Sequence, residues 1–382
     1  MTAMLRGIGL SLAAGLVAVA CSTFSGEGAD PGSDGGPESG TPADGGSADG
    51  TMALDAAGDA DTDCVARAPT CSPSGCAVED LRPAAPQLKP FSLVTDATHL
   101  YWVEQVQEDG GPDAYNGGAK ARIMRMPKAG GTAEELIRDQ DRAVAIEVAD
   151  DHVYWASGGN PAKVLRVKRT CTSPCTPEPV MVPGGTIVSI RRARDGSLFT
   201  RTDNDVIRSI DTSGTFAMLR SSSLSPADAL AALPSGVVSM HRLDAGVTIV
   251  SNDGQKETTY ASVPPNGGFA AGLEYAAGSC DRVWTARIAP GGFALHTIEA
   301  DAAVAQFGPI HALGIYDFKV DQAYVYIAMP NAGGLYALST TNSLAAPILV
   351  GGVANVFALA VDDDAVYWGV HDTGVIRRMK KR

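Results

Sequence analysis

Apolar and polar positions along this chain recur in a fixed order that is clearest in residues 148–168, VADDHVYWASGGNPAKVLRVK. An apolar run, an acidic turn, an apolar run with two aromatic residues, a glycine-rich turn and an alternating run follow one another. The same order returns in residues 359–380, LAVDDDAVYWGVHDTGVIRRMK, and, with an insertion, in residues 93–128. A unit that recurs at this spacing indicates a repeat architecture.

Each unit predicts four short antiparallel strands. Apolar and polar residues alternate with period two, and glycine, aspartate, asparagine and proline bound each run, as in half-buried strands. The units average about 44 residues, the length of one β-propeller blade. No stretch after residue 64 has a sustained helical period, so the predicted fold class is all-β. Seven first strands are expected, at residues 92–95, 145–149, 188–192, 229–233, 272–275, 316–320 and 357–361.

Aromatic residues mark the second strand of most units, and all the tryptophans of the chain are among them. In the fourth unit two valines, Val237 and Val238, stand at this place. Third strands are predicted at residues 123–126, 164–167, 206–209 and 375–378, and fourth strands at 135–137, 180–182, 217–219 and 348–350. The marker residues are Trp102, Trp155, Phe199, Trp284, Tyr326 and Trp368.

The last unit stops after its third strand, so the ring needs a strand from elsewhere. Residues 77–81, AVEDL, lie just before the first unit and are predicted to supply it. The chain from residue 64 to residue 382 then forms a seven-bladed propeller. A six-bladed propeller is the alternative, if the fourth unit is not a complete blade.

The aromatic pairs resemble the YWTD propeller repeat. The pattern is carried by Tyr101-Trp102, Tyr154-Trp155 and Tyr367-Trp368, and in the second unit Asp150 precedes the pair while Val164 and Arg166 follow it. The Thr-Asp half of the motif is replaced in all three units. The resemblance therefore implies the propeller fold and not the receptor biology of that family.

The first 20 residues have the features of an export signal. Arg6 supplies a positive charge, and the apolar segment of residues 8–20 is too short to span a bilayer. The ending Ala18-Val19-Ala20-Cys21 resembles the bacterial lipobox, which implies cleavage before Cys21 and its lipidation. An ordinary secretory signal with an incidental cysteine is the alternative. The whole chain also resembles exported bacterial propeller lipoproteins.

Residues 21–63 are predicted to be a disordered tether. Residues 22–63 contain ten acidic residues and no lysine or arginine, and glycine, serine, alanine and proline fill most other positions. Such a segment cannot bury enough apolar surface to fold. Residue 22 is serine, which by the sorting rule of enteric bacteria implies the outer membrane. Residues 64–382 have 29 basic and 33 acidic residues, so no basic field predicts nucleic-acid binding.

Six cysteines besides Cys21 suggest disulfides, because an exported chain meets an oxidising compartment. Cys171 and Cys175 bracket Thr-Ser-Pro and are expected to close a local bridge. The other four allow three pairings, in one of which Cys280 would staple the N-terminal segment to a blade. The spacings do not favour a zinc site. The four cysteines left open are Cys64, Cys71, Cys76 and Cys280.

Candidate chemistry is sparse. The chain has none of the hydrolase, metalloprotease or phosphate-loop motifs, so no catalytic residue, metal or cofactor is predicted. His99 and His152 occupy equivalent turns, which indicates a structural role, and the turn acids Asp150, Asp151 and Asp362–Asp364 are expected to accept backbone hydrogen bonds. The third-strand arginines Arg125, Arg166, Arg208 and Arg377 are expected to face solvent rather than an anionic groove.

The insertion at residues 105–120 lengthens the first unit and is the predicted ligand loop, with Tyr115 and Asn116 as its candidate contacts. Taken together, the sequence predicts a membrane-anchored lipoprotein of the bacterial envelope. Its propeller would act as a non-catalytic binding or scaffold module for a protein or glycan partner. The alternative is a propeller hydrolase or lyase with a site in the central channel.

Overall fold

The computed structural model describes part of the chain between residues 71 and 381. The gaps are residues 73–74, 107–119, 159–160, 182–184, 193–195, 203–205, 212, 214, 222–226, 233–235, 242–246, 252–253, 261–269, 276–282, 290–291, 299–303, 312–314, 316, 330–332 and 353–354. The chain divides into two units, Met1–Gly50 and Thr51–Arg382, and all described residues belong to the second. The predicted signal peptide, the tether and residues 107–119 of the predicted ligand loop lie outside the described residues, with Cys21, Cys64, Tyr115, Asn116 and Cys280.

The described residues form seven four-stranded antiparallel sheets, the blades of a propeller. Blades 1 and 2 comprise β4 (Leu88–Thr95), β5 (His99–Val106), β6 (Lys120–Pro127) and β7 (Glu134–Asp141), then β8 (Ala143–Ala149), β9 (His152–Ser157), β10 (Lys163–Lys168) and β11 (Glu178–Met181). Blades 3 and 4 comprise β12 (Ile187–Arg192), β13 (Leu198–Thr202), β14 (Val206–Ile210) and β15 (Phe216–Ser221), then β16 (Ala227–Ala232), β17 (Gly236–His241), β18 (Val247–Ser251) and β19 (Glu257–Tyr260).

The remaining blades repeat the same plan. Blades 5 and 6 comprise β20 (Ala270–Tyr275), β21 (Val283–Ala289), β22 (Gly292–Ile298) and β23 (Val304–His311), then β24 (Asp317–Val320), β25 (Tyr324–Met329), β26 (Gly334–Ser339) and β27 (Ile348–Gly351). Blade 7 comprises β28 (Val356–Val361), β29 (Ala365–Val370), β30 (Val375–Lys380) and β3 (Val78–Arg82). A hairpin of β1 (Cys71–Ser72) and β2 (Gly75–Cys76) precedes β3.

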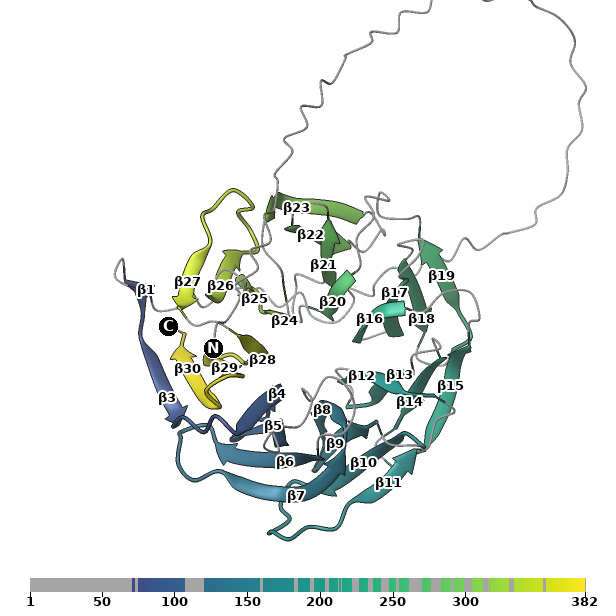
Figure 1. Ribbon diagram of the computed structural model, residues 1–382. Helices are drawn as coiled ribbons and strands as arrows, with labels where there is room; N and C mark the ends of the chain where they lie inside the picture. The colour runs from purple at the N-terminus through teal and green to yellow at the C-terminus, as the bar shows by residue number, and fades with distance from the viewer. Residues whose placement is uncertain are drawn as a thin grey trace, which may run out of the picture. The chain divides into compact units, whose positions relative to one another are not determined.

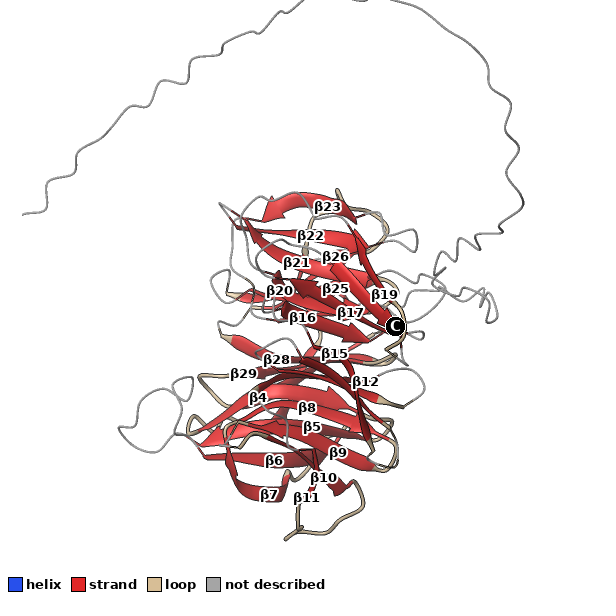
Figure 2. Ribbon diagram, turned by 90° about the vertical axis from the view of Figure 1, so that its right-hand side faces the viewer, coloured by secondary structure: helices blue, strands red, loops and turns tan. Residues whose placement is uncertain are grey.

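The blades form a ring with the first strand of each at the centre (Figure 1). Each first strand contacts the first strand of the next blade, and β28 of blade 7 contacts β4 of blade 1. A view from the side shows the stacked, twisted blades (Figure 2). The seven-bladed prediction is confirmed and the six-bladed alternative is wrong, since blade 4 is a complete sheet. The described residues contain no helix long and apolar enough to cross a bilayer.

The ring is closed by the strand that the sequence predicted. β3 pairs antiparallel with β30, with Val78 opposite Met379 and Asp80 opposite Arg377. The predicted segment of residues 77–81 differs from the observed strand by one residue at each end. Because β3 precedes blade 1 in the chain and completes blade 7, the two ends of the propeller are joined by backbone hydrogen bonds.

Two rows of second-strand side chains build the core between blades. Tyr101 belongs to the first row, here the Tyr row, and packs in one cluster with Trp155 of the next blade. Trp102 belongs to the second row, here the Trp row, and packs in one cluster with Tyr367 of the preceding blade. Because successive residues of a strand point to opposite faces, each aromatic pair bridges its blade to both neighbours.

The pairing also shows the row of three aromatic residues that mark second strands. Trp284 lies opposite Glu274 of its first strand, as Tyr101 lies opposite Val94, so Trp284 belongs to the Tyr row. Phe199 and Tyr326 belong to the same row and do not match Trp102. In blades 3, 4 and 5 the Trp row is held by small polar residues, which are fully buried: Thr200, Ser239 and Thr285.

A buried carboxylate fixes the closing strand to blade 1. The side chain of Glu104 on β5 is fully buried and forms ion pairs with Arg82, the last residue of β3, and with Arg122 of β6, whose Nη2 lies 2.9 Å from Glu104 Oε2. The indole Nε1 of Trp102 donates to Glu104 Oε1 at 3.3 Å, and the Arg82 guanidinium lies 5.7 Å from the Trp102 ring centre. This network joins the strand from the N-terminal side of the propeller to its first blade.

We expect Glu104→Gln to lower the free energy of unfolding by about 3 kcal/mol, because it leaves the buried Arg82 without its counter-charge and leaves Arg122 with Glu135 alone. Urea denaturation of the full-length chain measures this. Glu134→Gln is the matched control, since Glu134 pairs with Arg125 but is 55% exposed, and it should cost less than about 1 kcal/mol. Equal losses in the two variants would contradict a special role for Glu104.

Candidate functional site

A cavity of about 370 Å³ opens at the centre of the ring. Its walls are the first strands of blades 1, 2, 3, 6 and 7, so five segments remote in sequence meet there. We call it the central cavity. A preformed hollow with apolar walls and a few polar groups is the usual form of a ligand site.

Apolar side chains at one level of the cavity come from β-bulges. The pairing of β4 with β5 skips Phe91, that of β8 with β9 skips Val144, and that of β28 with β29 skips Phe357. A bulge adds one residue to a strand and redirects its side chain. All three bulged residues line the cavity, and they form its apolar level.

Charged side chains form a second level of the cavity wall. On β8, for example, Glu147 lies three residues after the bulged Val144. Glu147, Arg191 and Lys319 lie opposite the Tyr-row residues of their blades, and all three line the cavity with Asp317. In the other blades the same row holds Val94 of blade 1, Ala231 of blade 4, Glu274 of blade 5 and Ala360 of blade 7. Because alanine fits the row equally well, the fold does not require charges there.

Each charged group is held by a contact with the protein. Glu147 Oε1 accepts the backbone N–H of Val148 at 3.1 Å, and Arg191 Nη1 donates to the Ile190 carbonyl at 3.2 Å. Lys319 Nζ lies 3.7 Å from Asp317 Oδ1. The wall therefore carries two anionic and two cationic groups at defined places.

A buried hydroxyl lies in the wall next to these charges. Ser189 on β12 is 8% exposed and lines the cavity, and among the described residues its Oγ has no hydrogen-bond partner. An unsatisfied buried hydroxyl costs about 1–3 kcal/mol. A polar group in the cavity would remove that cost.

The histidines singled out in the sequence do not line the cavity. The rings of His99 and His152 lie 6.1 and 5.9 Å from those of Tyr101 and Tyr154, at equivalent places. This repetition agrees with the predicted structural role. His371 lies against Phe357, which lines the cavity, with ring centres 4.6 Å apart and ring planes tilted by 36°.

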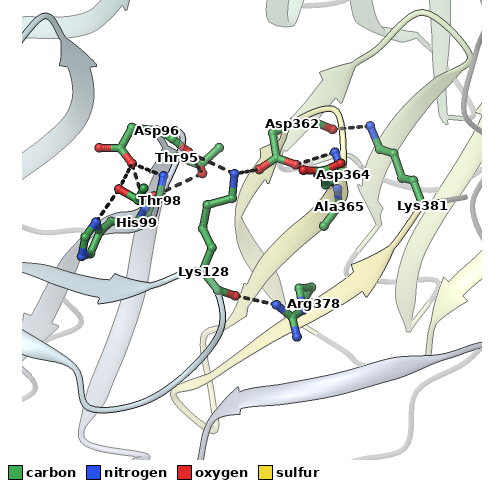
Figure 3. A network of polar contacts seen from close by, with 10 residues as sticks. All are labelled: Thr95, Asp96, Thr98, His99, Lys128, Asp362, Asp364, Ala365, Arg378 and Lys381. Atoms are coloured by element: carbon green, nitrogen blue, oxygen red, sulfur yellow. Dashed lines mark hydrogen bonds and ion pairs between the residues drawn. The ribbon is translucent and has the colours of Figure 1, made fainter.

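Of the turn acids predicted from the sequence, Asp362 accepts backbone hydrogen bonds, and Asp96 and Asp321, which were not predicted, do the same in two other blades. Asp362 Oδ1 accepts the backbone N–H groups of Asp364 and Ala365 at 2.9 and 2.8 Å, as Figure 3 shows. Asp96 Oδ1 accepts those of Thr98 and His99, both at 2.7 Å. In blade 6 Asp321 makes the same turn. Each acid closes the turn between the first and second strands of its blade.

These acids also join neighbouring blades, in contacts that we call interblade clasps. Lys128, just after β6 of blade 1, forms an ion pair with Asp362 of blade 7, and its carbonyl accepts from Arg378 of blade 7 at 2.6 Å (Figure 3). Arg169 of blade 2 reaches Asp96 of blade 1 in the same way, with 2.8 Å between Nη1 and Oδ2. Lys381 of blade 7 pairs with Asp321 of blade 6.

The lowered pKa of Asp96 shows that the contacts of one interblade clasp stabilise its ionised carboxylate. Burial opposes ionisation of this carboxyl, but hydrogen bonds from the Thr98 and His99 amides, the Arg169 guanidinium and the Tyr101 hydroxyl lower its pKa well below the usual value. Burial, together with the Asp96 charge, raises the pKa of Tyr101 in turn. Asp96 is therefore a structural anion and not a proton donor.

The third-strand arginines form cross-strand ion pairs. Arg125, Arg166 and Arg377 lie opposite Glu134, Glu178 and Asp80 on the fourth strands, and each pairs with that acid. Their side chains are between 11 and 25% exposed, which is less than the predicted solvent-facing position implies. Burial lowers the pKa of Arg208. None of the four lines the central cavity.

The cysteines and metal ligands complete the list of sequence candidates. Cys171 and Cys175 form the predicted local disulfide, and Cys71 is joined to Cys76 across the β1–β2 hairpin. The latter bridge excludes a pairing of Cys280 with either Cys71 or Cys76. Within the described part of the chain, no three histidine, cysteine or acidic side chains are grouped as metal ligands.

Comparison with known proteins identifies the fold class. No family model and no curated protein matches the chain. Virginiamycin B lyase from Staphylococcus aureus with quinupristin matches at 12% identity over 80% of this chain and 99% of that chain, with a TM-score of 0.61. YCF48 bound to D1 peptide matches at 14% identity over 81% and 98%, with a TM-score of 0.56. The WD40 propeller of Doa1 matches at 12% over 79% and 96%, with a TM-score of 0.54. At these identities the likeness shows the β-propeller fold alone.

We expect Asp96→Asn to lower the free energy of unfolding by about 1–3 kcal/mol at pH 7, because asparagine keeps the turn but loses the charge that Arg169 binds. The pKa of Asp96 is depressed in the folded state, so its contribution is present above the unfolded pKa of about 3.9 and is lost as pH falls below it. The gap between wild type and variant in urea denaturation should therefore narrow from pH 6 to pH 3.

The matched control for this series is Asp363→Asn, at an exposed turn position, which should change the free energy of unfolding by less than about 0.5 kcal/mol. A gap for Asp96→Asn that stays constant across the pH range would show that its charge does not stabilise the fold.

Proposed function

We propose that this protein is an exported, lipid-anchored binding module whose central cavity holds a small ligand or an inserted segment of a protein or glycan partner. The observation that carries the proposal is the cavity wall, where charges and a buried hydroxyl occupy positions for which the fold has no need. Glu147, Arg191 and Lys319 stand in a row that accepts alanine in other blades. Departures from local rules of this kind are expected at functional sites.

The structure of the cavity supports binding by a rigid scaffold. Its polar groups lie on strands whose neighbours are fixed by the interblade packing, so a ligand would meet a wall that is already ordered. One fold relative, YCF48, has been solved with a bound peptide. Fold likeness does not transfer that activity, but it supports the capacity of this architecture to hold a peptide.

A second candidate function is a hydrolase or lyase that acts in the same cavity. The observation in its favour is that two carboxylates, Glu147 and Asp317, line one cavity, and carboxylates can serve as general acid and general base. An enzyme would lose turnover and keep binding in Glu147→Gln or Asp317→Asn. A binding module would show no turnover of any bound ligand in the unchanged chain.

The location belongs to the proposal as well. The lipobox-like ending at Cys21 supports an anchor in the bacterial envelope, with the outer membrane suggested by Ser22. Residues 21–63 would hold the propeller away from the lipid surface, with a root-mean-square reach of roughly 35 Å.

Val144→Phe tests whether ligands enter the cavity. The two equivalent bulge positions beside it, Phe91 and Phe357, already carry phenylalanine, so a third should fold and narrow the cavity. We expect the affinity for a ligand found by native mass spectrometry of the full-length chain to fall at least about tenfold, or about 1.4 kcal/mol. Thermal unfolding of the unliganded variant should be unchanged within a few degrees.

Val144→Ile is the control, because it adds a single methylene group and leaves the cavity open. A partner whose affinity is the same for wild type, Val144→Phe and Val144→Ile binds elsewhere, and the cavity proposal would then be wrong.

Cys21→Ser tests the anchor. We expect the full-length protein to fractionate with membranes and to incorporate labelled palmitate, and the variant to do neither, since a serine offers no thiol for diacylation. Stable anchoring requires more than one acyl chain. Membrane association that is unchanged in Cys21→Ser would reject lipidation at this residue.

A further inference from the structure

We infer that the ligand of the central cavity is a zwitterion with an apolar substituent, of the chemical class of amino acids and short peptides with free termini. The inference rests on the proposed function and names the substrate class of that site. It depends on the order in which charges, a hydroxyl and aromatic rings are arranged along the wall.

The charged level presents both signs at one height. Glu147 of blade 2 and Arg191 of blade 3 stand on adjacent first strands, in equivalent register opposite Tyr154 and Phe199. Lys319 stands at the same height on blade 6, beside Asp317 on its own strand. Two blades, 7 and 1, separate blade 6 from blade 2 along this side of the ring. A ligand in the cavity is therefore between an anion–cation pair on each side.

A balanced wall selects against ligands with a single charge. A pure anion or a pure cation would meet one favourable and one repulsive group on each side, and burying an unmatched charge is costly. A zwitterion satisfies both members of a pair. Electrostatic complementarity of this kind discriminates between ligands by the repulsion of wrong partners as well as by attraction.

The pair on blades 2 and 3 also sets the orientation. Arginine binds a carboxylate through parallel N–H groups better than lysine does, so Arg191 is assigned the ligand carboxylate and Glu147 the ligand ammonium group. Lys319 and Asp317 lie 3.7 Å apart and partly neutralise one another on the opposite wall.

The apolar level of the cavity favours an apolar substituent on the ligand. Phe91, Val144 and Phe357 come from blades 1, 2 and 7 and line the cavity next to the charged level. An aliphatic or aromatic side chain would bury its surface against them at about 25 cal/mol per Å². Ser189 lies between the bulge level and Arg191 on its strand, where its hydroxyl can bind the carboxylate or a peptide group.

The test uses the dipeptide leucyl-leucine and the full-length chain in isothermal titration calorimetry. Three derivatives are compared with it: the N-acetyl form, the C-terminal amide and the doubly blocked form. We expect the free dipeptide to bind, each single block to weaken binding by roughly tenfold or more, and the double block to abolish it, since each removes one charge-assisted contact.

Variants assign each contact to a residue. Arg191→Gln should weaken binding of the free dipeptide and remove its preference over the amide, while Glu147→Gln should remove its preference over the N-acetyl form. Arg192→Gln is the matched control, because Arg192 is the next residue on β12, is exposed and does not line the cavity. It should leave all four affinities unchanged.

The outcomes separate the ligand class from the proposed function. Equal affinities of the free and blocked dipeptides, or binding that is insensitive to Val144→Phe, would overturn the zwitterion. If leucyl-leucine does not bind while another ligand does so in a way that Val144→Phe weakens, the cavity function stands and the zwitterion is wrong. If no ligand or partner responds to Val144→Phe, both proposals fail.

Discussion

Closure of the ring is the constraint on which the rest of this structure depends. Among the described residues each blade packs mainly against its two neighbours, so blades 7 and 1 have no stable interface until the two ends of the chain meet. β3 provides the backbone pairing, and Arg82 at its end brings a positive charge to the buried Glu104 of blade 1. An isolated buried carboxylate is strongly unfavourable. Arg122 pairs with Glu104 within blade 1, but the second arginine, Arg82, reaches it only in the closed ring, which ties the stability of both ends together.

The same interblade registry positions the central cavity. The Tyr row and the Trp row fix how far each blade turns against the next, and the residues opposite the Tyr row are those that carry charges into the centre. Interblade clasps join blade 6 to 7, 7 to 1 and 1 to 2. These four blades also supply most of the cavity wall. Blades 3 to 5 have Thr200, Ser239 and Thr285 where blades 1, 2 and 7 have tryptophan, so the bulkiest interblade packing falls on the side of the ring that carries the cavity.

A feature of this structure could be predicted from the sequence when it depends on a few consecutive residues. Strand alternation, turn acids and the disulfide between Cys171 and Cys175 depend on a few consecutive residues, and these predictions were confirmed together with the closing strand. The cavity could not be found in this way, because it draws its walls from five blades and because a bulge shifts the direction of Phe91 or Val144 by one position. The row that Trp284 occupies could not be predicted for a related reason, since only the strand pairing shows which row a residue belongs to.

One signal in the sequence could have led to the cavity. The first strands are short and mostly apolar, and Glu147, Arg191 and Lys319 interrupt them at one repeat position where Ala231 and Ala360 also occur. In a repeat protein, the residue types that recur at a position are those that the fold requires. A position where several blades carry a different residue type is therefore a candidate for function. The buried hydroxyl of Ser189, which has no hydrogen-bond partner among the residues that the structure describes, lies two residues from Arg191 on the same strand. The charged side chains and the buried hydroxyl thus lie in one wall of the cavity, and a bound ligand would account for both.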